Sequence, residues 1–182
     1  MGSARRWTTC PGCGVELPAN DWQAQQPGRT TECWELYGEV LAHEQAALSL
    51  VRDYHQLTVD AYAAQHPAGN RMGLVYGLVG LHLTLDRDIA GVDVRTMHQR
   101  MTDTVVHWPD LVPPATRGAV TVADVALASG VDAHADLVTR WAQDVWRAWA
   151  DAHRAIATLT DDHLLPLMPS LLTHRRDGPP AG

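Results

Sequence analysis

The chain has 182 residues and a formal net charge of −7 at pH 7, and no basic run is longer than the pair Arg175-Arg176. Nucleic acid and anionic membranes are therefore poor partners. It contains no lysine, which excludes a Schiff-base lysine, a pyridoxal-phosphate anchor and a P-loop lysine. The longest apolar run, 73–85, is too short to cross a bilayer and the first residues carry no signal-peptide pattern. We therefore expect a cytoplasmic protein.

A chain of this length fits one compact core. We divide it into an N-terminal cysteine loop segment at 1–30, a helical domain at 31–160 and a C-terminal tail at 161–182. Proline and glycine are dense between Cys10 and Arg29, which predicts a loop without strands. Such a loop needs something to hold it in place, and a bound metal would do so.

Helices are expected wherever apolar residues recur at a spacing of 3.6. They fall in chain order at about 33–49, 50–65, 71–87, 91–104, 122–128 and 132–159. The break between the first two is placed around 46–50, although one continuous helix would also fit the pattern. The predicted fold class is therefore all-α, a bundle of five or six helices with an N-terminal zinc-knuckle-like loop.

The last long helix carries an apolar stripe made of Leu137, Trp141, Val145 and Trp149. Tryptophans at this spacing are more often part of a core than of a ligand cage, so we interpret them as core.

Two cysteines, Cys10 and Cys13, form a CPGC turn, and Cys33 stands at the predicted start of the first helix. Two thiolates from one tight turn can occupy two corners of a zinc tetrahedron. A redox pair and unligated thiols are the alternatives, but redox CxxC sites occur in βαβ units, which this sequence does not predict. We therefore favour a zinc site that also uses Cys33, where the helix dipole stabilises a thiolate.

The fourth ligand is expected to be His66. If the first two helices are antiparallel, the start of one lies beside the end of the other, which places Cys33 level with His66. His55 lies eleven residues earlier, about 16 Å away at a rise of 1.5 Å per residue. An exposed or capping histidine is the alternative reading of His66.

A second cluster follows from the same arithmetic, because Glu44 lies in the apolar arc of the first helix, where an unpaired carboxylate is costly. Eleven residues separate Cys33 from Glu44 and His55 from His66, and His82 lies about as far down the third helix. Glu44, His55 and His82 are thus expected at one height. They would suit an open metal site or an acid–base group, and equally a buried network that fixes helix register.

Tyr62 is expected to face inward beside His55 and to donate a hydrogen bond there, whereas Asp53 and Asp60 are expected to point outward. The remaining histidines have no comparable context and are interpreted as surface or connector residues: His43, His98, His107, His134, His153, His163 and His174.

Three stretches, CPGCG, CWELYGEVLAHE and HQLTVDAYAAQHP, resemble an uncharacterised bacterial family of the domain-of-unknown-function type. The resemblance runs from about Cys10 to the tryptophan-rich helix near Trp149, and the HQLTVDAYAAQHP block is its most specific part. It implies no activity, so the functional argument rests on the residues.

Two functional classes remain open. The first is a small zinc-binding helical module that binds a small molecule or a partner protein. The second is a metalloenzyme of the hydrolase or lyase type that uses Glu44, His55, His82 and Tyr62. The number of bound metals distinguishes them, because one tight zinc favours the module and a second, exchangeable metal favours the enzyme.

Overall fold

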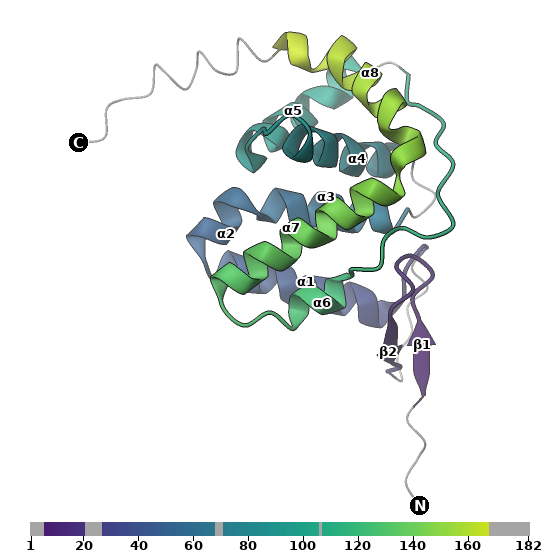
Figure 1. Ribbon diagram of the computed structural model, residues 1–182, viewed down its shortest axis with the longest axis vertical. Helices are drawn as coiled ribbons and strands as arrows, with labels where there is room; N and C mark the ends of the chain where they lie inside the picture. Colours follow the sequence, from purple (N-terminus) through teal and green to yellow (C-terminus); the bar gives the residue numbers. More distant parts are fainter. Residues whose placement is uncertain (1–5, 21–26, 68–70, 106, 168–182) are drawn as a thin grey trace, which may run out of the picture.

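The computed structural model describes residues 6–20, 27–67, 71–105 and 107–167 (Figure 1). Two strands come first, β1 (Trp7–Thr9) and β2 (Glu16–Pro18). The α-helices are α1 (Thr31–Gln45), α2 (Leu48–Asp53), α3 (His55–Gln65), α4 (Arg71–Leu85), α5 (Gly91–Thr104), α6 (Val122–Ala126), α7 (Val131–Ala148) and α8 (His153–His163). Two 3-10 helices complete the set, η1 (Ala150–Ala152) and η2 (Leu165–Leu167). The described part of the chain is mainly helical, which confirms the predicted fold class.

Helix α3 lies at the centre of the molecule. Figure 1 shows α4 on one side of it, α1 on the other and α7 crossing in front, and α3 also contacts α2 and α5. Eight of its eleven residues are buried. Because a helix buried on all sides cannot leave polar groups to water, each polar side chain of α3 needs a partner on a neighbouring helix.

The described residues form eight α-helices, two more than the largest number predicted, because two predicted helices are interrupted. The expected break after α1 occurs at Ala46-Ala47, but a second one at Tyr54 separates α2 from α3. The predicted helix 132–159 stops at Trp149, although it contains no proline or glycine. The cause is tertiary: the Trp149 indole N–H donates to the Ala64 carbonyl at 3.1 Å, and α8 then turns to pack on α4.

The N-terminal segment is a β-hairpin, which corrects the prediction of a strand-free loop. Strands β1 and β2 pair in an antiparallel manner, with Thr8 opposite Leu17. The Cys10 N–H donates to the Val15 carbonyl at 2.9 Å, and the Gly14 N–H donates to the Cys10 carbonyl at 2.8 Å. Gly14 has a φ of 77°, a conformation that glycine adopts without strain. The breakers therefore form the tight turn of the hairpin, and this turn carries the CPGC motif.

The tryptophans of α7 belong to the core. Trp141, Trp146 and Trp149 are all buried, and each indole N–H has an acceptor. Trp141 donates to Gln65 at 3.0 Å and Trp146 to Asp86 at 3.2 Å, in addition to the bond from Trp149. A buried indole satisfied in this way ties two helices together and excludes water from the space between them.

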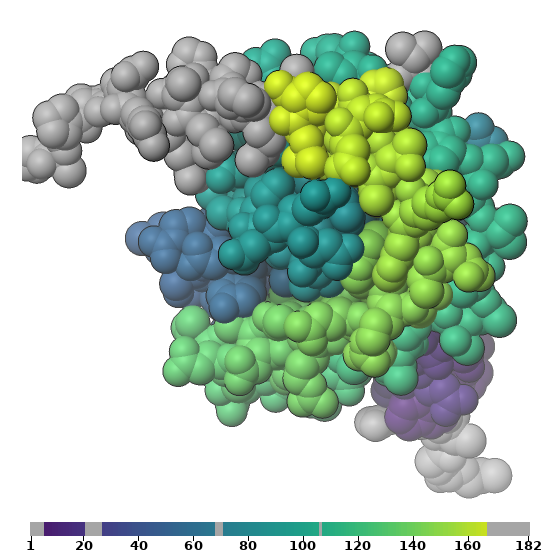
Figure 2. All heavy atoms as spheres, turned by 45° about the horizontal axis from the view of Figure 1, so that its top comes forward, coloured from purple at the N-terminus to yellow at the C-terminus, as the bar shows by residue number. Residues whose placement is uncertain are grey.

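The C-terminal part of the described chain covers α4. Figure 2 shows α8 lying across the surface at this end of the molecule. Helix α8 continues to His163, past the predicted start of the tail at 161, and η2 follows it. Residues 168–182 of the predicted tail lie outside the described residues. None of the helices in the described ranges combines the length and the apolar character needed to span a membrane.

Close packing of α3 on α4 depends on small residues of α4. A Cβ added at Gly80 would overlap the carboxyl group of Asp60, and one added at Gly77 would lie 2.8 Å from the Asp60 carbonyl oxygen. Gly38 in the middle of α1, by contrast, has open space around it.

This contrast predicts opposite effects for the same substitution. Gly38→Ala should raise the free energy of unfolding by about 0.5–1 kcal/mol, because alanine restricts the unfolded chain and favours a helix. Gly80→Ala should lower it by about 1–3 kcal/mol, because α4 must move away from Asp60. Urea unfolding measures both, and a gain of stability in Gly80→Ala would contradict the observed packing.

Candidate metal centre

Four predicted ligands come together at one end of α3. The ligand atoms of Cys10, Cys13, Cys33 and His66 all lie within 4.8 Å of one another. The two hairpin cysteines come from the turn between β1 and β2, Cys33 from the first turn of α1, and His66 from the residue that ends α3. The expected antiparallel arrangement of α1 and α3 is what brings Cys33 level with His66.

The distances within the group fit a tetrahedral metal site. The Sγ atoms of Cys13 and Cys33 are 3.9 Å apart, and the Cys33 Sγ is 3.3 Å from the Nε2 of His66. Thiolates at about 2.3 Å and an imidazole at about 2.0 Å from one tetrahedral ion would be separated by about 3.8 Å and 3.6 Å respectively. A disulfide would require about 2.05 Å between sulfurs, and all three cysteines are free.

The ring of His66 is oriented by Tyr62. The Nδ1 of His66 lies 2.9 Å from the Tyr62 carbonyl oxygen, which can only accept, so Nδ1 carries the proton. In the neutral ring the lone pair is therefore on Nε2, the atom that faces Cys33. The Tyr62 ring stacks on His66 at 3.9 Å between centroids. Such fixing of the second ring nitrogen is characteristic of metal-binding histidines.

Most of the group is enclosed by the protein. Cys10, Cys33 and His66 are each at most 3% exposed, whereas Cys13 is partly exposed. Gly12 lies against the His66 ring, where a Cβ would overlap it. The guanidinium of Arg117 donates to the carbonyls of Gly12 and Pro11. These bonds tie residues 107–121, the connector before α6, to the hairpin turn.

The three thiols influence one another's ionisation. Hydrogen bonds from Cys13 and Cys33 hold the pKa of the Cys10 thiol far below its usual range. The bond to Cys10 raises the pKa of Cys13 to about 11 and that of Cys33 far above its usual value. The cluster by itself thus favours one thiolate and two thiols, and full deprotonation requires a nearby positive charge, which a divalent cation would supply.

The second predicted cluster forms only in part. Glu44 is fully buried and accepts three hydrogen bonds, from the Nδ1 of His55 at 2.8 Å, the hydroxyl of Thr58 at 2.5 Å and the Nε2 of His134 at 3.1 Å. His55 lies beside Glu44, as the spacing of eleven residues predicts. His134, which was assigned to the surface or a connector, is buried and occupies the position expected for His82.

His82 takes part in a different network. Its Nδ1 lies 2.9 Å from a carboxylate oxygen of Asp86, and Arg87 donates to its Nε2 at 3.3 Å. The height of His82 along α4 does not bring it to Glu44, because α3 lies between α4 and α1 (Figure 1). His134 could have been identified from spacing, since it lies four residues before Val138 and seven before Trp141 on the buried face of α7.

Tyr62 faces inward as predicted, but its hydroxyl lies 3.8 Å from the Cys33 sulfur, at the cysteine cluster.

Asp60 does not point outward: it is 2% exposed, and burial raises the pKa of its carboxyl group well above the usual value. It accepts from Gln56 at 3.0 Å and lies 4.0 Å from the Nδ1 of His98. Burial lowers the pKa of His98 to about 4, so this imidazole is uncharged at neutral pH.

Residues 8–150 match a family described as a family of unknown function, DUF5946, and the chain belongs to that family. The matched span contains the hairpin turn, all four residues of the cysteine cluster, and Glu44 with its three partners. Neither the curated proteins nor the solved structures that were searched contain a match.

The two histidines of α3 should differ in their effect on metal binding. His66→Ala removes a ligand atom, so its bound metal should pass to a competing chelator at least about tenfold faster than that of the unmodified protein. His55→Ala removes only one of the three bonds to Glu44 and should leave the rate of metal loss unchanged. Metal release into a colorimetric chelator measures both rates, and the reverse order would exclude His66 as the fourth ligand.

Proposed function

We propose that this member of the DUF5946 family is a small zinc-binding helical module that binds a small molecule or a partner protein. Zinc held by Cys10, Cys13, Cys33 and His66 would fasten the N-terminal hairpin to α1 and α3. The observation that carries the proposal is the convergence of three thiols on an imidazole whose free nitrogen faces them. Three thiolates and one imidazole are a donor set typical of structural zinc.

A structural role is favoured over a catalytic one at this centre. Catalytic zinc keeps one coordination position for water or substrate, whereas structural zinc has four protein ligands. Here the chain supplies four ligands, three of them almost fully buried. Bound zinc would cross-link the hairpin, α1 and α3, in addition to the apolar contacts that Val15 and Leu17 of the hairpin make with the core. The free thiols also suit a reducing compartment, which supports the proposed cytoplasmic location.

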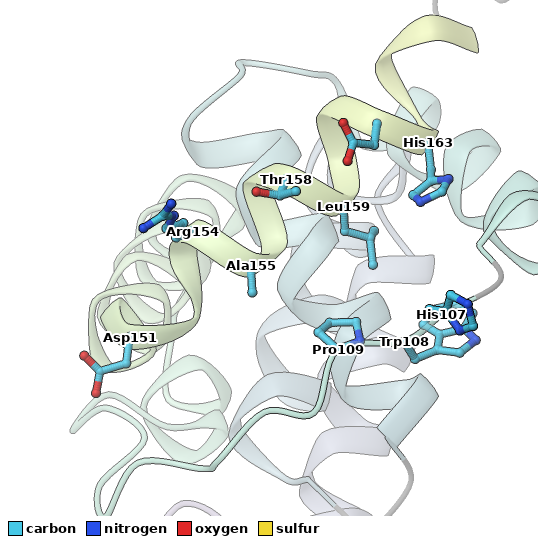
Figure 3. A pocket seen from close by; sticks show the side chains of 10 residues that line it. His107, Trp108, Pro109, Asp151, Arg154, Ala155, Thr158, Leu159 and His163 are labelled. Carbon is cyan, nitrogen blue, oxygen red and sulfur yellow. The ribbon is translucent and has the colours of Figure 1, made fainter.

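The best candidate for the binding function is a groove of about 590 Å³ between α8 and the connector before α6 (Figure 3). Its volume is within the range of small-molecule sites. Ala155 and Leu159 of α8 face Pro109 and Trp108 of the connector, while Asp151 and Arg154 lie at the opposite end from His107 and His163. An apolar floor with polar groups at its ends suits a small aromatic compound carrying polar substituents.

The alternative function, a metalloenzyme built on Glu44, His55, His82 and Tyr62, receives less support. His82 is paired with Asp86, and Tyr62 lies at the cysteine cluster, so only Glu44 and His55 of the proposed set are in contact.

Zinc content tests the proposal directly. Protein purified without a histidine tag should contain one tightly bound zinc per chain by elemental analysis. The double variant Cys10→Ser/Cys13→Ser should lose it, and its thermal unfolding temperature should fall by at least about 10 °C, because zinc binding is coupled to folding. Thr8→Ser, a conservative change in β1 outside the cluster, should alter neither quantity. Full retention of zinc in the double variant would refute the site.

A second experiment tests the groove. A set of aromatic fragments titrated into ¹⁵N-labelled protein should shift amide signals of Trp108 and of neighbouring residues of α8. Ala155→Trp fills the groove and should abolish these shifts. Ala157→Trp places the same bulk on the same helix, at a residue of similar burial that does not line the groove, and should preserve them. Shifts confined to other surfaces would show that the groove is not the binding site.

A further inference from the structure

A small pocket lies between α1, α6 and the start of α7, beside the buried Glu44. It has a volume of about 110 Å³, and Glu39, His43 and His134 all line it. Glu39 and His43 are one helical turn apart on α1 and are exposed, whereas His134 is 1% exposed. Glu44 lies behind His134, with its Oε1 3.1 Å from the Nε2 of that ring. The rest of the lining is apolar (Val40, Val125, Ala126 and Ala128), so one carboxylate and two imidazoles supply the donor side chains of a space large enough for an ion with bound water.

We propose that Glu39, His43 and His134 form an open site for a divalent transition-metal ion, and that Glu44 is the positioning residue for His134. This second site is distinct from the cysteine cluster, with which it shares no residue. Two imidazoles and one carboxylate on one side of an ion leave further coordination positions for water or for a ligand.

The spacing of the two imidazoles fits a shared ion. Their ring centroids are 5.1 Å apart, with an angle of 38° between the ring planes. Two imidazoles bound to one tetrahedral ion at about 2.0 Å place their centroids about 5 Å apart. In the described ranges, only the cysteine cluster has three ligand atoms already within 4.8 Å of one another. Binding of an ion therefore requires the exposed side chains of Glu39 and His43 to turn toward His134, which their positions on the surface of α1 allow.

Glu44 determines which nitrogen of His134 is available. A carboxylate 3.1 Å from Nε2 accepts its proton, so the lone pair of the neutral ring is on Nδ1. This leaves His134 with one nitrogen fixed by a buried carboxylate and one nitrogen free to bind a cation. A carboxylate, a histidine and a metal in series is a recurrent arrangement, in which the carboxylate orients the ring and strengthens it as a ligand.

The competing explanation is that Glu44 only fixes the packing of α1, α3 and α7. A buried ion pair of that kind holds helices in register and needs no ligand. It accounts for the contacts of Glu44 with Thr58, His55 and His134, but it gives no role to His43 and Glu39, which line the pocket together with His134. The two explanations differ in whether the protein binds a second metal ion.

Cobalt(II) is the probe for this site, used with protein that carries zinc in its cysteine cluster and no histidine tag. Cobalt at an imidazole–carboxylate site gives visible absorption without the intense near-ultraviolet band of cobalt bound to thiolates, so exchange at the first site is recognised. Equilibrium dialysis followed by elemental analysis counts both metals. We expect one cobalt per chain in addition to the zinc.

The variants separate the ligands from the positioning residue. His43→Ala and Glu39→Gln, both at exposed positions, should weaken cobalt binding at least about tenfold with no change in unfolding temperature. Glu44→Gln should weaken it about 10- to 100-fold and change the cobalt spectrum, an effect that a purely structural role would not produce. Glu35→Gln, a matched change at another exposed carboxylate of α1 that does not line the pocket, should bind cobalt like the unmodified protein.

Two outcomes would overturn the proposal: no cobalt beyond the zinc in the unmodified protein, or equal cobalt affinity in His43→Ala. Equal affinity and an unchanged spectrum in Glu44→Gln would remove Glu44 from the site. If Glu44→Gln fails to fold, His43→Ala decides the question by itself. Zinc content per chain is measured in every sample, so failure of the second site does not resemble failure of the first.

Discussion

The fold depends on the burial of α3, a helix that carries polar side chains on most of its faces. Burial of such a helix requires partners for most of its polar groups, since an unpaired buried group costs about 1–3 kcal/mol, and one oxygen of Asp60 is the exception on α3. Thr58 donates to Glu44 on α1, Gln65 bonds both Trp141 on α7 and the connector before α6, and His66 reaches Cys33. Two of these residues bond α1, at its two ends, and Gln65 bonds α7 and the connector, so the polar groups of one helix specify the arrangement of several other segments.

The polar groups at the two ends of α3 have partners of different chemistry. At its C-terminal end, three thiols and His66 form an enclosed group that fits a cation with no remaining coordination position. At its N-terminal end, His55 lies beside the buried carboxylate of Glu44, which accepts hydrogen bonds from side chains of α3 and α7. The first arrangement suits a cross-link, whereas the second lies next to a pocket and leaves one histidine nitrogen available. A closed metal site for stability and an open one for binding are therefore compatible in one small domain.

The groove in Figure 3 belongs to a different part of the molecule. One wall consists of η1 and α8, most of which follow the residue at which the family match ends, whereas both polar clusters lie within the matched span. Trp108 on the other wall stacks on Tyr76 of α4, with 5.6 Å between centroids. The position of the groove thus depends on the turn at Trp149, which directs α8 onto α4 instead of continuing along α3.

Local features of the sequence were sufficient for the helical class, for the CPGC turn and for the cysteine–histidine group. Apolar periodicity and glycine and proline breakers act over a few residues, and the pairing of Cys33 with His66 follows from two helices running in opposite directions. The same spacing placed Glu44 beside His55. Tertiary structure alone decided that the third side chain beside Glu44 and His55 is His134 and not His82. The position of His82 along α4 does not determine the direction in which its side chain points, and α3 separates α4 from Glu44. The break at Trp149 depends on the Ala64 carbonyl, which accepts the hydrogen bond from its indole. The burial of Asp60 depends on the space left by Gly80. Both partners are distant in the chain, so no local sequence pattern predicts either feature.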